Sequence, residues 1–140
     1  MVRKYLVRVL VVGEKAQEYL TAQQLFERNN CQCRFAKSQQ EVVALPNLRE
    51  YDIVLSALRV PGETIRGLVA LLSGSRASLF CSLRVERGYW WLPVLKRGKE
   101  CFGTPAFRLG DFVDAFDQLV KEINLNMTVP LPSSTVRISE

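Results

Sequence analysis

The sequence predicts a single α/β domain with a doubly wound, five-stranded parallel sheet at its centre. Two patterns lead to this prediction. Short apolar segments rich in valine alternate with longer segments whose apolar residues recur at helical spacing. The connections are short, and a helix between two strands implies a parallel pair with a right-handed crossover. With 140 residues, 48% of them hydrophobic, the chain can build one sizeable core.

The first strand, helix and second strand are expected within the first 36 residues. Residues 5–12, YLVRVLVV, are almost continuously apolar, as in a strand that is buried on both faces. Gly13 ends this strand, and an apolar stripe at helical spacing then runs as far as Phe26. Asn29-Asn30 is expected to end the helix, because asparagine tolerates the left-handed conformation. Residues 31–36 alternate in polarity and predict the second strand.

Capping and turn residues mark the middle of the chain. Ser38, followed three residues later by Glu41, is typical of a capping box and predicts a short helix that ends at Pro46. Pro61-Gly62 predicts a turn. The other elements expected here are a strand at residues 52–55, a helix at 65–72 and a strand at 77–83.

Residues 84–103 break the alternation of strands and helices. Gly88, Pro93 and Gly98 interrupt every helical window, so we expect a β-hairpin where a fourth helix would otherwise lie. The predicted hairpin has a strand at 89–95, a turn at 96–99 and a second strand at 100–103, which is also the fifth strand of the sheet. Pro93 fits only an edge position, where no ladder hydrogen bond is lost.

The last predicted element is an amphipathic helix. Its apolar stripe runs from Phe112 to Ile123, and Gly110-Asp111 begins it. The segment after Asn126 is rich in proline, serine and threonine, so we expect a folded domain at 1–126 and an extended or disordered tail at 127–140. No apolar run has the length of a membrane span and no signal-peptide cleavage site follows the N-terminus, which predicts a cytoplasmic protein.

The composition excludes several classes of function. The chain has no histidine, which removes histidine-dependent catalysis and imidazole metal ligands, so we expect neither an enzyme nor a metal or cofactor site. Cys31 and Cys33 lack the spacing of a zinc site, and the four cysteines are interpreted as small buried apolar residues. The net charge is +5, but the arginines are spread along the chain, so neither nucleic acid nor a membrane is expected as a partner.

Four short segments carry a family resemblance through their order and spacing. They are residues 9–14 (VLVVGE), 52–62 (DIVLSALRVPG), 79–82 (LFCS) and 103–107 (GTPAF). They resemble, in that order, the acidic pair after the first strand, the phosphorylation strand, the fourth strand and the lysine-proline turn of bacterial response regulator receiver domains. The resemblance covers roughly residues 4–123. It implies a receiver-like, flavodoxin-like fold and a cis peptide between Thr104 and Pro105.

The same resemblance implies a degenerate phosphoacceptor pocket. Ala57 is at the position of the phosphorylated aspartate and has no oxygen nucleophile. Gly13 and Glu14 are at the positions of the two acidic Mg²⁺ ligands, so one carboxylate remains, which is too few for tight binding. Ser82 keeps the switching hydroxyl, whereas Thr104 replaces the lysine that pairs with the phosphoryl group. The chain is therefore interpreted as a pseudo-receiver that cannot be phosphorylated.

Two classes of function follow from this interpretation. The first is a protein-interaction module of bacterial signal transduction whose partner is a histidine kinase, another regulator or a second copy of the chain. The predicted interaction surface is formed by Tyr89, Trp90, Trp91, Arg97 and Lys99, with one tryptophan packed inward and the other exposed. Packing of both tryptophans over the sheet is an equally weighted alternative.

The second class is a small-molecule or nucleotide-binding domain that uses the carboxyl ends of the strands. Glu14, Ser56, Ser82 and Thr104 would line such a site. Against it, neither a GxGxxG motif nor a P-loop follows the first strand. An enzyme is the least favoured interpretation, because no nucleophile–base pair or metal cluster can be recognised.

Overall fold

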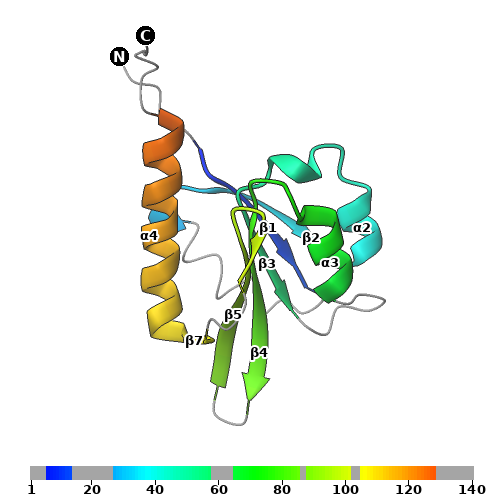
Figure 1. The fold of residues 1–140 in the computed structure, drawn as a ribbon. Helices are drawn as coiled ribbons and strands as arrows, with labels where there is room; N and C mark the ends of the chain where they lie inside the picture. The colour runs from blue at the N-terminus through cyan, green and yellow to red at the C-terminus, as the bar shows by residue number, and fades with distance from the viewer. Residues whose placement is uncertain (1–5, 14–26, 58–64, 86–87, 102–104, 129–140) are drawn as a thin grey trace.

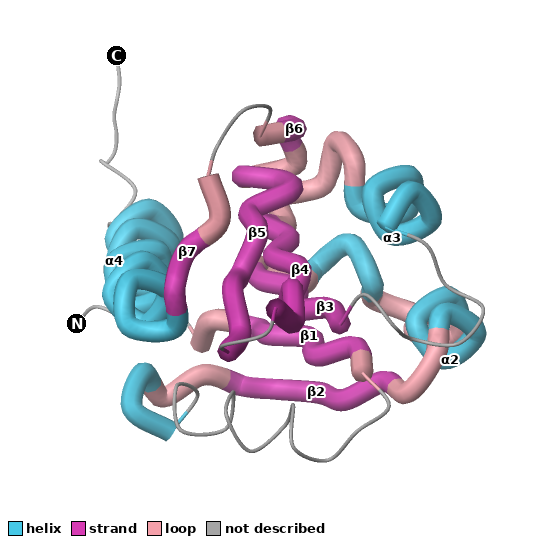
Figure 2. The backbone as a smooth tube through the Cα atoms, turned by 90° about the horizontal axis from the view of Figure 1, so that it is seen from below, coloured by secondary structure: helices cyan, strands magenta, loops and turns pink. Residues whose placement is uncertain are grey.

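The computed structural model of the chain describes residues 6–13, 27–57, 65–85, 88–101 and 105–128. The strands are β1 (Arg8–Val12), β2 (Gln32–Ala36), β3 (Ile53–Ala57), β4 (Ser78–Val85), β5 (Gly88–Lys96), β6 (Lys99–Glu100) and β7 (Phe107–Arg108). The helices are α2 (Gln39–Val43), the 3₁₀ helix η1 (Leu48–Glu50), α3 (Ile65–Leu72) and α4 (Leu109–Thr128). The sheet is the middle layer, with α4 on one side and α2 and α3 on the other (Figure 1 and Figure 2).

The sheet combines a parallel part with antiparallel additions. Its strand order is β2-β1-β3-β4-β5-β6, and β7 pairs with β5. The pairs β1–β2, β1–β3 and β3–β4 are parallel. An order of 2-1-3-4-5 is that of flavodoxin-like doubly wound sheets. The predicted α/β domain with parallel strands is therefore confirmed.

The prediction for the fifth strand is wrong. The fifth place in the sheet is taken by β5, which pairs antiparallel with β4, and not by a parallel strand at 100–103. Only two residues separate β4 from β5, whereas a parallel connection needs a crossover of about a dozen residues or more. Glu100 instead lies in β6, which pairs antiparallel with β5. The parallel part of the described sheet therefore has four strands rather than five.

One face of the sheet packs against α4. Val9 and Val11 of β1 are buried on this face, together with Phe112 and Phe116 of α4. Alternate residues of a strand point to opposite faces, so the near-continuous apolar sequence of β1 supplies both cores. The apolar stripe predicted for the last helix is the face of α4 that meets the sheet.

The opposite face packs against α2 and α3. Leu10 and Val12 of β1 are buried here, with Val42 of α2 and Leu68 and Leu72 of α3. Helices therefore cover both faces of the parallel strands, as a doubly wound sheet requires. No helix in the described ranges has the length and hydropathy to cross a bilayer.

Local signals in the sequence correspond to observed backbone features. Asn30 follows a helical turn and has φ 55°, the left-handed conformation expected for it. The Ser38 side chain accepts a hydrogen bond from the Glu41 backbone N–H and caps α2. Between β5 and β6, Arg97 and Gly98 have φ 51° and 80°, which is the requirement of a type I′ hairpin turn.

Several boundaries differ from the predicted ones. The strand predicted at 77–83 runs to Val85, and α4 runs to Thr128, two residues beyond the predicted end of the domain. Pro93 does not lie in an edge strand as predicted, because β5 pairs with β4 on one side and with β6 and β7 on the other. It lies opposite Phe80, beside a register shift between Leu79 and Phe80, a bulge that accommodates a residue without a backbone N–H. The helix predicted between Gly13 and Phe26, the tail from 129 and Thr104 of the predicted cis peptide lie outside the described residues.

Candidate functional site

Three residues of the site expected from the family resemblance lie at the carboxyl edge of the parallel strands. In the β1–β3 pairing Val12 is opposite Ser56, so the next residues, Gly13 and Ala57, are neighbours across the two strands. In the β3–β4 pairing Ala57 is opposite Ser82. The register therefore brings Gly13, Ala57 and Ser82 together in one row, although they are far apart in the sequence.

This row offers little for phosphoryl chemistry. Gly13 is buried, and its backbone N–H donates to the Ala36 carbonyl at 3.0 Å, which ties the end of β1 to β2. Ala57 has no side-chain oxygen that could act as a nucleophile, and Ser82 is half-buried. In the described ranges, no three cysteine, aspartate or glutamate side chains gather to form a metal site. Glu14 and Thr104, the other two predicted members, lie outside the described residues.

The two tryptophans of the predicted interaction surface have different environments. Trp91 is 7% exposed, and its ring stacks on Phe112 with centroids 4.5 Å apart and planes inclined by 14°. Trp90 is half-buried, and the Arg108 guanidinium lies 5.3 Å from its ring centroid. Trp91 therefore belongs to the core under α4, and Trp90 is the tryptophan that solvent reaches.

The charged part of the predicted surface lies at the other end of β5. Arg97 and Lys99 are exposed at the β5–β6 turn, whereas the side chain of Tyr89 lies outside what the structure describes. Trp90 and Lys96 are six residues apart on β5, a separation of about 20 Å along a strand. Trp90 and the charged pair Arg97 and Lys99 therefore do not form one compact patch.

The β5–β6 turn is fixed to the body of the domain. The Gly98 N–H donates to the Ala77 carbonyl at 2.8 Å, and the Arg97 N–H donates to the Ser78 hydroxyl at 3.1 Å. An added Cβ at Gly98 would lie 2.0 Å from the Ser75 carbonyl oxygen. The turn therefore packs on the segment that precedes β4, and glycine is required for this close approach.

The cysteines are free thiols in different environments. Cys81 is buried and Cys31 and Cys101 are half-buried, but Cys33 on β2 is exposed, which corrects the expectation that all four are buried. Burial raises the pKa of Cys31 to about 12, and the nearby Cys33, Asp52 and Asp117 add to this shift. A thiol with a raised pKa is a poor nucleophile at neutral pH, because the thiolate is the reactive form.

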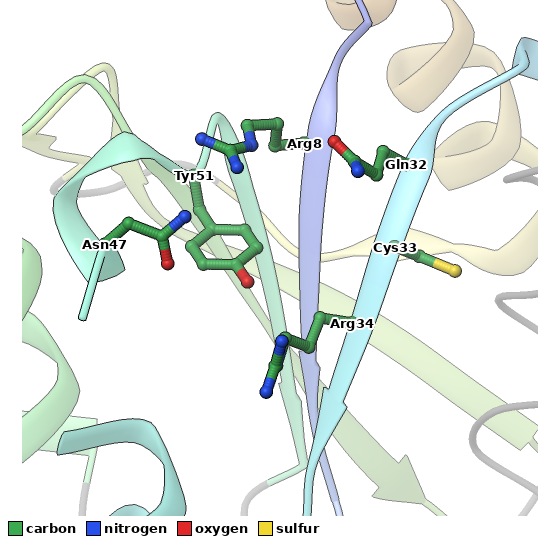
Figure 3. Close-up of a pocket in the computed structure, with 6 residues that line it drawn as sticks. All are labelled: Arg8, Gln32, Cys33, Arg34, Asn47 and Tyr51. Atoms are coloured by element: carbon green, nitrogen blue, oxygen red, sulfur yellow. The ribbon is translucent and has the colours of Figure 1, made fainter. Parts of the chain in front are cut away.

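A pocket that was not predicted lies at the opposite, amino edge of the sheet. Arg8, Gln32, Cys33, Arg34, Asn47 and Tyr51 line it, and its volume is about 180 Å³ (Figure 3). The sequence gives one indication of this pocket, because Arg8 interrupts the apolar run of β1 and a second arginine, Arg34, lies on the neighbouring strand. The contribution of Asn47 and Tyr51 is set by tertiary packing and has no local signature.

No protein-family model matches the chain, and no curated protein matches it. A solved structure described as a response regulator receiver domain protein from Clostridium thermocellum is similar to it with a TM-score of 0.49 and 11% sequence identity. The match covers 87% of this chain and 100% of that chain.

Proposed function

We propose that the chain is a receiver-like domain that accepts no phosphate and acts in signal transduction by binding a protein partner. The supporting observation is the row formed by Gly13, Ala57 and Ser82 at the carboxyl edge. Their register matches the arrangement in which a receiver holds its metal ligand, phosphorylated aspartate and switching hydroxyl. Two of these three positions lack the oxygen atoms that phosphate transfer and Mg²⁺ binding need.

The region after β4 also favours a role without phosphorylation. Receivers have a helix between the fourth and fifth strands, but residues 88–100 form β5, a two-residue turn and β6. A turn whose backbone N–H groups donate to the Ala77 carbonyl and the Ser78 hydroxyl has little freedom to switch between two positions. Signalling through this region would therefore rest on constitutive binding.

The partner is proposed to be a protein with an acidic surface. The chain carries 19 Lys and Arg against 14 Asp and Glu, which favours association with an acidic face. Trp90 supplies an accessible aromatic ring, and exposed tryptophan is frequent among residues that dominate interfaces. A histidine kinase or another regulator with an acidic face fits this description, whereas a second copy of the chain carries the same net charge of +5 and would have to bind through Trp90 instead.

Acetyl phosphate treatment tests the proposal. The protein is incubated with acetyl phosphate and Mg²⁺ beside a receiver with an intact aspartate, and intact masses are measured. We expect a phosphoryl adduct on the control receiver and an unchanged mass for this chain, because Ala57 offers no acceptor. An adduct mapped to residues near Ser56 would refute the proposal.

A further inference from the structure

The pocket at the amino edge combines two arginines with hydrogen-bonding groups. Arg8 and Gln32 are opposite each other in the β1–β2 pairing, and Arg34 lies two residues further along β2 on the same face. Figure 3 shows these side chains around a space that Asn47 and Tyr51 close from the other side, whereas Cys33 points away from it.

Arg8 is held in place by its surroundings. Its backbone N–H donates to Asp52 Oδ2 at 3.0 Å, and its carbonyl accepts from the Asp52 N–H at 2.9 Å. Its Nη1 contacts Glu50 Oε1 at 2.8 Å, and its guanidinium lies 5.9 Å from the Tyr51 ring centroid. Asp52 is itself fixed by Arg76 Nε at 3.1 Å. A guanidinium has five N–H donors, so the contact with Glu50 leaves donors available.

Arg34 brings a second positive charge to the same face. It is exposed, and it has no ion-pair partner among the residues that the structure describes. Glu50 is the carboxylate paired with Arg8, and its side chain is 60% exposed. The nearby Asp52 carboxylate is paired with Arg76. Arg8 and Arg34 against the Glu50 carboxylate therefore leave a net positive charge at the pocket. An anion that bridges them would remove their mutual repulsion and replace water as acceptor.

The size and lining of the pocket limit the ligand. Its volume of about 180 Å³ equals the liquid volume of roughly six water molecules and lies below the usual range for drug-sized ligands. This room suits one oxyanion group with a short attached chain. Planar guanidinium groups match the oxygens of carboxylate and phosphate, and the amides of Gln32 and Asn47 add neutral donors.

We infer that this pocket binds a small molecule through a phosphate or carboxylate group. The site is distinct from the carboxyl edge, so it goes beyond the proposed function and does not depend on it. Binding is non-covalent and needs no Mg²⁺, because the positive charge comes from Arg8 and Arg34.

Titration with two probes tests the inference. Amide NMR spectra of the full chain are recorded with increasing inorganic phosphate or succinate, with sodium chloride adjusted to keep the ionic strength constant. We expect saturable shifts that centre on residues 32–34 and Asn47. Saturation with phosphate alone assigns a phosphoryl ligand, saturation with succinate alone assigns a carboxylate, and saturation with both supports the shared chemistry.

Two arginine variants distinguish a site from general attraction to a basic protein. Arg34→Gln removes an exposed charge at the pocket, whereas Arg97→Gln removes an exposed charge at the β5–β6 turn. We expect about a tenfold loss of affinity for the first, typical of a charge-assisted hydrogen bond, and little change for the second. Equal weakening by both variants, or shifts that do not saturate with either probe, would overturn the inference. The mass measurement with acetyl phosphate would be unaffected by that outcome.

Discussion

Replacement of Trp91 by alanine is expected to reveal whether the aromatic contact with α4 holds the domain together. The Trp91 ring is 7% exposed and stacks on Phe112, which is fully buried and also contacts Phe80 at a centroid distance of 5.3 Å. The contact joins β5, which is antiparallel, to the helix that covers the parallel strands. Its loss would leave a cavity between the sheet and α4.

The magnitude follows from the burial of the ring. Truncation of a buried tryptophan or phenylalanine to alanine costs about 3–5 kcal/mol, against a total stability of about 5–15 kcal/mol for a domain. Trp91→Phe should cost much less, within about 1 kcal/mol. Phenylalanine keeps a ring on Phe112 and removes the indole N–H, which is buried without a hydrogen-bond partner among the described residues.

Urea unfolding followed by circular dichroism measures these differences. With a denaturant slope of about 2 kcal/mol per molar urea, Trp91→Ala should lower the midpoint by roughly 1.5–2.5 M. Trp90→Ala is the matched control, because its ring is half-buried and its contact with Arg108 is worth about 1 kcal/mol or less. If the two alanine variants unfold at the same urea concentration, the stacked Trp91 ring does not stabilise the core.

Two further predictions concern a turn and a thiol. Gly98→Ala should lower the melting temperature, because Gly98 has φ 80° and the added Cβ would lie 2.0 Å from the Ser75 carbonyl oxygen. Gly110→Ala should raise the melting temperature, because Gly110 lies in α4 and an added Cβ there would have nothing within 4 Å. Equal melting temperatures would contradict this. Burial raises the pKa of Cys31 from 9.0 to about 12, so the folded state binds this proton more tightly. Its contribution to stability is complete below pH 9.0 and is lost as the pH rises through about 12. From about pH 8 to 11, the free energy of unfolding should fall less steeply with pH for Cys31→Ala than for the wild type. If the two proteins show the same pH dependence of this free energy, the Cys31 thiol does not contribute to it.

Most local structure could be predicted from the sequence because local patterns determine it. The apolar run of β1 predicted a strand buried on both faces, and Val9 and Leu10 indeed lie in the two separate cores. Ser38 and Asn30 adopt the cap and left-handed conformation expected of them. Each of these outcomes depends on a residue and its near neighbours in the chain.

The candidate site could be predicted only in part. Motif spacing placed Gly13, Ala57 and Ser82 at one edge, and the strand register brings them into one row. The predicted interaction surface proved to be divided, because Trp91 packs on α4 while the exposed charges lie near the far end of β5. Alternation along a strand predicts that Trp90 and Trp91 point to opposite faces, but it does not predict which face of β5 packs against α4. The tertiary structure therefore decided which tryptophan is buried.

By itself, the sequence determined the types of most described elements, the parallel α/β core and the lack of a side-chain oxygen at Ala57. These properties follow from side-chain periodicity and from the chemistry of single residues. Only the tertiary structure decided the direction of the fifth strand and the pocket at the amino edge. The two-residue connection between β4 and β5 is too short for a crossover, so β5 runs antiparallel to β4. The pocket contains Arg8 and Tyr51, which are 43 residues apart and come together only when β1 and β3 pair. Contacts between residues so far apart in the sequence produce no local sequence pattern from which they could be predicted.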